Sequence, residues 1–176
     1  MAESSKRRPL VGAIRWDAWY GRLPDGVPLP DPKRRPGYNP ERGDLGPDPG
    51  WEAQISLSPE RWRYRWPFFT TFDAAGKPVF DGSRPEILAR EIAYARHAGL
   101  DYWAFDTYPE DCPLSYALRA FLDTPGRNEI EFCLFLVMAS AYGSLAEDAA
   151  FQEYVLRLVA EPNYLKLAGN RPVFYL

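Results

Sequence analysis

The segment Glu86 to Tyr108, EILAREIAYARHAGLDYWAFDTY, decides the fold class of this chain. Its first half carries apolar residues at helical spacing, and its second half is a short apolar run that ends in polar side chains. Gly99 lies between the two halves and supplies the left-handed residue that commonly ends a helix. The segment therefore predicts a helix followed by a buried strand, which is one step of an α/β fold.

The pattern also indicates where this helix begins and where the strand ends. Ser83 and Glu86 match the S-x-x-E pattern of a capping box, and the expected buried stripe follows it: Ile87, Leu88, Ile92 and Ala95. The strand is expected over 102–108, with Asp106 and Tyr108 near its carboxyl end. A parallel strand covered on both faces tolerates polar groups only where it emerges from the sheet. We therefore expect Asp106 and Tyr108 to lie at the mouth of a site.

The same alternation recurs on both sides of this segment. A second capping box, Ser144 with Glu147, precedes a helix whose apolar stripe is Phe151, Val155, Leu158 and Val159. The other expected elements are an opening strand over 10–20, a helix over 114–122, a buried strand over 131–138 and, after Gly169, a strand over 172–176. Strands that alternate with helices in this way predict a parallel α/β sheet.

Two parallel architectures fit this order, a doubly wound open sheet and an eight-stranded barrel. The first strand is followed by no glycine-rich phosphate-binding turn, which weakens the doubly wound alternative. Polar and aromatic side chains instead gather at three strand ends: Trp16, Asp17, Trp19 and Tyr20; Asp106 and Tyr108; Ser140 and Tyr142. A barrel places its site on that face, so the sequence favours a (β/α)8 barrel.

The chain is short for such a barrel, which typically needs about 250 residues. With 176 residues it accounts for about four β/α units, the N-terminal half of a TIM barrel. We expect one partial domain over 1–176, with a flexible tail over 1–9 and a long Pro- and Trp-rich loop over 21–83 on the active face. An open sheet of this kind leaves an unpaired edge, which predicts a truncated product, a fragment or one partner of a two-part assembly.

Composition narrows the possible partners. The net charge of −3 supplies no basic face for nucleic acid, and no apolar run reaches the length of a membrane span or a secretory segment, so we expect a soluble, cytoplasmic protein. Cys112 and Cys133 lack metal-ligand spacing and are expected to be packing residues. The only histidine, His97, falls in the last turn of a helix, where a structural role is favoured. No metal or cofactor is expected.

The second half of the long loop is too aromatic to be simply disordered. Its large rings are Trp51, Trp62, Trp66, Phe68 and Phe69. Such rings stack on the apolar faces of sugars, but they also form small cores that fix a loop to a domain. The sequence leaves both alternatives open.

The runs RWDAWYG, RWPFF, EIAYARHAGLDYWAFDTY, FCLFL and YLKLAGNRPVFYL together resemble the glycoside hydrolase family 99-like group, which includes the WbsX-like polysaccharide proteins. The resemblance covers nearly the whole chain from Val11 and is most specific at 98–105 and 164–176. It implies a TIM barrel acting on α-linked, mannose-type glycans, with Trp16, Tyr20 and Asp106 facing substrate. It also implies that the principal catalytic glutamates lie beyond residue 176, so the catalytic residues of this chain stay unknown.

The expected substrate-binding set is Trp16, Asp17, Tyr20, Trp66, Asp106 and Tyr108. Glycoside hydrolysis needs two carboxyl groups on either side of the scissile bond, and Asp17 with Asp106 is the pair that neighbouring strand ends offer. A glycan is the expected partner, and a second chain or the absent half of the barrel is another. The alternatives are a noncatalytic carbohydrate-binding half-barrel and an unstable structural remnant.

Overall fold

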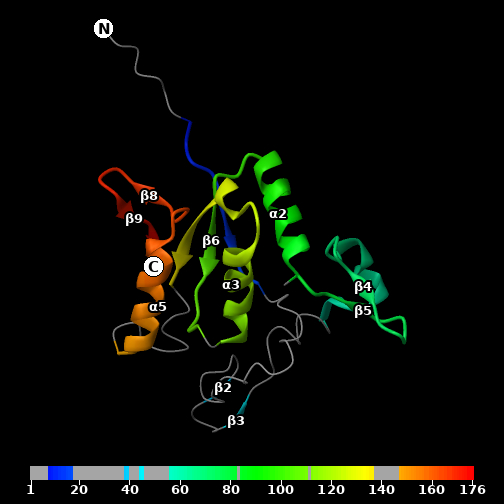
Figure 1. Cartoon of the computed structure of the whole chain (residues 1–176). Coiled ribbons are helices and arrows are strands. Elements are labelled where there is room, and N and C mark those ends of the chain that lie inside the picture. Colours follow the sequence, from blue (N-terminus) through cyan, green and yellow to red (C-terminus); the bar gives the residue numbers. More distant parts are fainter. Residues whose placement is uncertain are drawn as a thin grey trace.

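A parallel four-stranded sheet forms the centre of the molecule (Figure 1). The computed structural model describes residues 8–17, 38–39, 44–45, 56–82, 84–110, 112–136 and 147–176. The strands are β1 (Gly12–Arg15), β6 (Tyr102–Asp106), β7 (Glu131–Phe135) and β10 (Phe174–Tyr175), and they lie side by side in chain order. The predicted parallel α/β sheet is confirmed.

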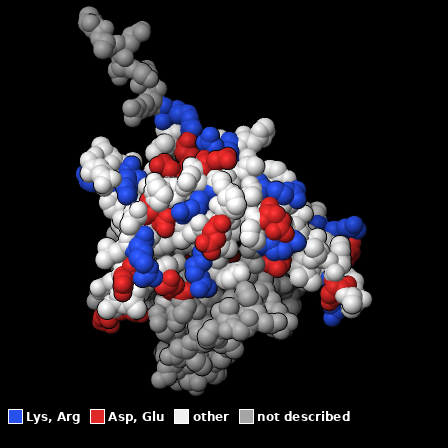
Figure 2. Space-filling view, in the orientation of Figure 1, with Lys and Arg blue, Asp and Glu red and all other residues white. Residues whose placement is uncertain are grey.

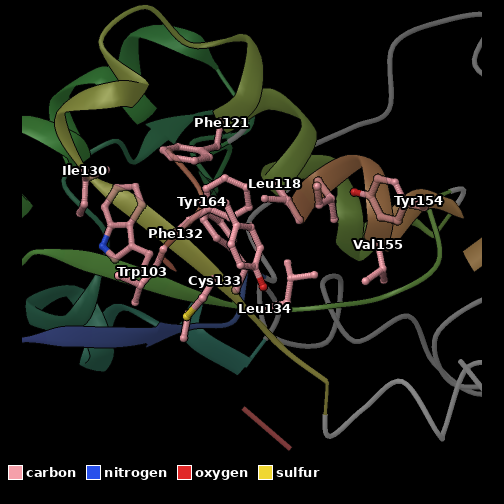
Figure 3. Packing of buried hydrophobic residues seen from close by; sticks show 14 of the residues in the cluster. Trp103, Leu118, Phe121, Ile130, Phe132, Cys133, Leu134, Tyr154, Val155 and Tyr164 are labelled. Atoms are coloured by element: carbon pink, nitrogen blue, oxygen red, sulfur yellow. The ribbon is translucent and has the colours of Figure 1, made fainter. Parts of the chain in front are cut away.

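Three helices connect successive strands and pack against the sheet (Figure 1). They are α2 (Pro85–His97), α3 (Tyr116–Asp123) and α5 (Ala149–Ala160). One apolar cluster joins the buried sides of all three helices to the rings of β6 and β7. Phe121 of α3 lies at its centre and contacts the rings of Trp103, Phe105 and Phe132 (Figure 3).

Strand register assigns the remaining side chains to the opposite face of the sheet. Residues paired across parallel strands share a face, and successive residues alternate between faces. Trp103 and Phe105 therefore point toward the helices, on what we call the helix-covered face. What we call the open face carries the alternate residues: Gly12, Ile14, Tyr102, Ala104, Asp106, Glu131, Cys133, Phe135 and Tyr175. The Cys133 sulfur points away from the rings of the helix-covered face in Figure 3.

The fourth strand position is interrupted. Tyr164 forms a parallel bridge with Phe132, after which the chain makes the hairpin β8 (Lys166–Leu167) and β9 (Arg171–Pro172). It then returns beside β7 as β10. The expected strand over 172–176 is thus limited to two residues, and Tyr164 occupies the place before them.

The helix starts differ from the predicted capping boxes. α2 begins at Pro85, and its N-cap residue Arg84 makes no side-chain capping hydrogen bond. Proline at the first helical position has the helical φ already and has no amide hydrogen that needs a partner. Ser83 lies outside the described residues. α5 is capped by Asp148, whose carboxylate accepts a hydrogen bond from the Phe151 amide at 3.0 Å. The Ser144–Glu147 prediction is therefore wrong at Glu147, which precedes this cap, and Ser144 lies outside the described residues.

The strands are shorter than predicted because side chains and turns terminate them. At the amino end of β1 and β6, the Asp101 carboxylate accepts hydrogen bonds from the Val11 amide and from Arg8. Arg8 is therefore paired with Asp101, and residues 1–7 of the expected tail lie outside the described residues. At the other end of β6, Thr107 donates its amide to Phe135 and its hydroxyl to Phe105.

Part of the predicted 21–83 loop has regular structure. It contains the 3-10 helix η2 (Glu60–Arg65) and the hairpin of β4 (Thr71–Phe72) with β5 (Pro78–Val79). A second antiparallel pair is β2 (Tyr38–Asn39) with β3 (Asp44–Leu45). A small core attaches the second half of this segment to α2: Phe69, Phe80 and Ile87, with Leu57 and Trp66 packed against it. Two further 3-10 turns are η3 (Pro113–Ser115) and η4 (Arg127–Glu129).

Several single-residue predictions are confirmed. Gly99 has a φ of 82° after α2, and His97 is the exposed last residue of that helix. Cys112 and Cys133 are both buried. Acidic and basic side chains are interleaved on the molecular face seen in Figure 2. Within the described part of the chain, no helix is long and apolar enough to cross a membrane.

Candidate functional site

Three predicted site residues are connected by hydrogen bonds at the carboxyl ends of β1 and β6. The indole Nε1 of Trp16 donates to the Tyr108 hydroxyl at 2.9 Å, and that hydroxyl donates to Oδ2 of Asp106 at 2.8 Å. Trp16 follows β1, whereas Asp106 ends β6 and Tyr108 lies two residues beyond it. The structure thus brings Trp16, Asp106 and Tyr108 together, as the strand-end pattern predicts, and we call this group the strand-end cluster.

The chain after β6 is fixed by local contacts, so Tyr108 has a defined position. Its ring is buried in a small apolar cluster with Cys112 and Leu114. The Ser115 hydroxyl lies 3.0 Å from the Tyr108 carbonyl and 2.9 Å from the Pro109 carbonyl, both of which can accept its proton. Tyr108 is therefore a buried anchor whose hydroxyl reaches the site, and its ring is not an exposed platform for sugar.

Trp16 is the exposed aromatic group of the strand-end cluster. Nearly half of its surface, 48%, is open to solvent, although its indole nitrogen is engaged by Tyr108. A ring held by its edge while its apolar surface faces water is suited to stack on a flat apolar ligand surface. Trp16 is thus positioned before any ligand arrives.

Asp106 is the chemically active group of the strand-end cluster. Burial raises the pKa of its carboxyl above the usual range, while the hydrogen bond from Tyr108 opposes this change. Oδ1 of the same carboxyl is buried and has no hydrogen-bond partner among the described residues. A buried acceptor without a partner is costly, and a donor that reached it would offset that cost.

Asp17 is engaged elsewhere. Its carboxylate accepts from Nε of Arg15 at 2.7 and 2.8 Å, and Nη2 of Arg15 donates to Glu91 of α2 at 2.6 Å. The Arg15 guanidinium also lies 4.5 Å from the centre of the Trp103 ring, on the helix-covered face. The structure therefore does not bring Asp17 to Asp106 as a pair of carboxylates.

This ion cluster is poorly solvated, and the charges compensate one another. Burial alone lowers the pKa of Arg15, but the carboxylates of Asp17 and Glu91 outweigh burial and leave it raised. Burial raises the pKa of Glu91, and Arg15 opposes that effect. Sequence analysis missed Arg15 and Glu91. Strand alternation carries the relevant signal, because an arginine on the apolar side of a strand needs an acidic partner on the covering helix.

The other predicted binding residues do not join the strand-end cluster. Trp66 packs beside the small core of the 56–82 segment, where its Nε1 donates to the Leu57 carbonyl at 2.8 Å. Of the two interpretations of the loop aromatics, the structure supports the packing role for Trp66 and Phe69. The predictions for Trp19, Tyr20, Trp51, Ser140 and Tyr142 lie outside the described residues.

Metal-ligating groups do not cluster in the part of the chain that the structure describes. Burial raises the pKa of the Cys133 thiol to about 12, so this residue stays protonated and apolar at neutral pH. The chemistry that these residues offer is therefore stacking by Trp16 and hydrogen-bond acceptance by Asp106.

No model of a known protein family matches this chain, and comparisons with curated proteins and with solved structures found no match either. The interpretation of the site accordingly rests on the chemistry of its own residues.

Proposed function

We propose that this protein binds a glycan at the carboxyl ends of β1 and β6, as part of a glycoside hydrolase-like protein that acts on α-linked, mannose-type polysaccharide. The supporting observation is the hydrogen-bonded series of Trp16, Tyr108 and Asp106. A sugar ring presents an apolar face to an indole and hydroxyls to a carboxylate, and the strand-end cluster provides both.

We further propose that the four strands are half of a (β/α)8 barrel. Sequential parallel order supports this, because a doubly wound sheet reverses its strand order at the switch point, and β1, β6, β7 and β10 do not. The strand-end cluster lies at the carboxyl ends of two of these strands, the end at which barrel enzymes place their sites.

In this proposal the described residues bind the glycan and do not hydrolyse it. Hydrolysis needs a second carboxyl group across the scissile bond from the first. Asp106 is available for one such role, whereas Asp17 is neutralised by Arg15. The noncatalytic carbohydrate-binding alternative therefore also draws support from this site, and turnover by the chain separates it from the enzyme.

Calorimetric titration with α-mannose oligosaccharides tests the proposed binding. We expect Trp16→Ala and Asp106→Asn each to weaken binding about tenfold, as buried or stacked contact residues commonly do. Tyr64→Ala is the matched control, because Tyr64 is an exposed aromatic residue on η2, outside the strand-end cluster.

The binding proposal fails if the wild-type chain gives no heat of binding, or if Trp16→Ala and Tyr64→Ala behave alike. Hydrolysis is measured on the same oligosaccharides. Robust turnover that disappears in Asp106→Asn contradicts the assignment of a binding role alone and makes Asp106 a catalytic residue.

A further inference from the structure

Trp16 follows the last paired residue of β1. The register of β1 with β6 ends where Arg15 pairs with Phe105, and Trp16 is the next residue along the chain. Its indole nitrogen donates to the Tyr108 hydroxyl, while nearly half of the side chain stays exposed. A ring that binds by stacking gives higher affinity when it is held in place before the ligand arrives. The contacts that fix the chain around Trp16 therefore bear on ligand binding.

The residues on either side of Trp16 are joined through their side chains. Nε of Arg15 donates to both carboxylate oxygens of Asp17, at 2.8 and 2.7 Å. Nη2 of the same guanidinium donates to Glu91 of α2 at 2.6 Å. Successive side chains of an extended segment point in opposite directions. The contact that directs Arg15 and Asp17 toward α2 therefore directs Trp16 away from it, toward Tyr108.

Arg15 is itself fixed by the rings of β6. Its guanidinium lies 4.5 Å from the centre of the Trp103 ring and 5.6 Å from the centre of the Phe105 ring. A guanidinium is planar, stacks on aromatic rings and presents its donors in a rigid fork, whereas a lysine amine has no such fork. A continuous series of contacts thus leads from the helix-covered face through Arg15 to Asp17, the residue after Trp16.

Stability alone does not account for these three charges. The side chains of Arg15, Asp17 and Glu91 are mostly buried. Desolvation offsets much of the attraction in a buried ion pair, and well-packed apolar residues often give equal stability in its place. What the charged groups add is direction, because charge-assisted hydrogen bonds from a guanidinium to carboxylates require a specific geometry. A requirement for geometry at this position points to the ring that the cluster surrounds.

We infer that Arg15, Asp17 and Glu91 are positioning residues for Trp16. They fix the chain on both sides of Trp16, and so hold its indole at the strand-end cluster in the orientation that stacks on a sugar ring. They act through Trp16 and do not touch the ligand. The inference rests on the proposed function for the identity of the ligand, but the position of the Trp16 ring is measured without any glycan.

NMR of the Trp16 indole N–H tests the positioning. Trp16→Phe identifies its resonance among those of the six tryptophans, and Tyr108→Phe shows where the resonance moves when the hydrogen bond is removed. We expect Asp17→Ala to move it in the same direction and to speed its hydrogen exchange about tenfold. Arg15 keeps Glu91 as its partner in that variant, so the fold should be retained.

Glu161→Ala is the matched control. Glu161 forms an ion pair with Arg127 at 2.8 Å, outside the strand-end cluster, so its loss should lower stability without moving the Trp16 resonance. The inference is overturned if Asp17→Ala leaves that resonance in place, or if Glu161→Ala moves it equally.

Arg15→Lys gives the same test if Asp17→Ala fails to fold. Lysine keeps the positive charge between the two carboxylates, but it lacks the fork that reaches both of them in one geometry. We expect the Trp16 resonance to move in this variant as well, and an unmoved resonance overturns the inference.

Binding of α-mannose oligosaccharides gives a second measurement. Asp17→Ala should weaken binding, by at most the loss of about tenfold expected for Trp16→Ala. In a Trp16→Ala background, Asp17→Ala should weaken it no further, because Asp17 acts only through that ring. Unchanged affinity in Asp17→Ala, or a full additional loss in the Trp16→Ala background, overturns the inference. If the wild type binds no α-mannoside, the proposed function fails, and the NMR result still decides the positioning role.

Discussion

The two faces of the parallel sheet are built from alternate residues of the same strands, yet they have different compositions. The helix-covered face has large rings packed against three helices, with Phe121 in contact with Trp103, Phe105 and Phe132. The open face has small residues at its centre, and the strand-end cluster lies at the carboxyl end of the sheet. Ala104 and Cys133, at the centre of the open face, are nonetheless buried. The difference therefore indicates that large rings on the helix-covered face stabilise the fold, while the strand ends are the part of the sheet available for binding.

This division explains why the strand-end cluster tolerates groups that are unfavourable in a core. Oδ1 of Asp106 has no hydrogen-bond partner within the described part of the chain, which costs stability, and a densely packed helix-covered face offsets such a cost. Substitutions on the two faces should therefore have separable effects. Four substitutions test that separation, from the largest expected effect to the smallest.

Phe121→Ala should give the largest loss of stability. Phe121 is fully buried and contacts three other rings, so its removal leaves a cavity at the centre of the helix-covered face. We expect the free energy of unfolding to fall by about 3–5 kcal/mol. Urea denaturation followed by circular dichroism measures this change.

Leu156→Ala serves as the control for Phe121→Ala because Leu156 lies on the exposed side of α5. Its effect should stay within about 0.5 kcal/mol. Equal losses for the two variants would contradict the assignment of Phe121 to the centre of the core.

The helix-covered face was also the more predictable one. Helical spacing predicted a buried stripe on α2, and all four of its residues are buried: Ile87, Leu88, Ile92 and Ala95. Apolar periodicity is a property of many residues at once, so one local exception does not remove it. Helix starts depend on single contacts, which explains why Arg84 and Asp148 replaced the predicted caps.

The candidate site was predictable in position but only partly in composition. Trp16, Asp106 and Tyr108 meet because parallel strands end at the same edge, which the strand pattern indicates. The engagement of Asp17 by Arg15 and Glu91 joins residues from β1 and α2 that are far apart in the chain. Contacts of this kind depend on how the helix lies against the sheet, and no local pattern specifies that.

Arg15→Met should give the second largest effect. Arg15 neutralises Asp17 and Glu91 at the border of the helix-covered face, so its loss leaves two poorly solvated carboxylates without a counter-charge. We expect the chain to lose about 2–4 kcal/mol, at or below the cost of breaking a buried ion pair, since these side chains keep some solvent contact. Denaturation at neutral pH measures the loss.

A double variant sharpens this prediction. Adding Glu91→Gln to Arg15→Met removes one of the two stranded charges, and part of the lost stability should return. If the double variant is less stable than Arg15→Met by the full cost of Glu91→Gln alone, the two side chains do not interact energetically as described.

Gly12→Ala tests the packing of the open face. A Cβ on Gly12 is placed 2.2 Å from the ring of Tyr102, so that ring has to move and its hydrogen bond to Tyr175 is disturbed. We expect a loss of about 1–3 kcal/mol, as is typical of overpacking. The same substitution in a Tyr102→Ala background should cost much less, and an unchanged cost there would argue against the contact.

Asp106→Asn should give the smallest change in the free energy of unfolding, and the test is how that change depends on pH. Burial raises the pKa of Asp106, so the folded chain holds this proton more tightly than the unfolded chain, whose aspartates titrate near about 3.9. The stabilisation from that proton is complete below the unfolded pKa and is lost as pH rises through the folded pKa. The free energy of unfolding of Asp106→Asn should therefore improve relative to the wild type over that interval.

Asp101→Asn is the control of opposite sign for this measurement. The hydrogen bond from Arg8 lowers the pKa of Asp101, so its stabilisation is present above the unfolded pKa and is lost as pH falls through the folded pKa. Urea midpoints of both variants and the wild type across acidic pH, at one protein concentration, should diverge in opposite directions. Parallel curves would show that burial does not raise the pKa of Asp106. The proposal that this carboxyl is a poorly solvated acceptor for a ligand hydroxyl would then lose its support.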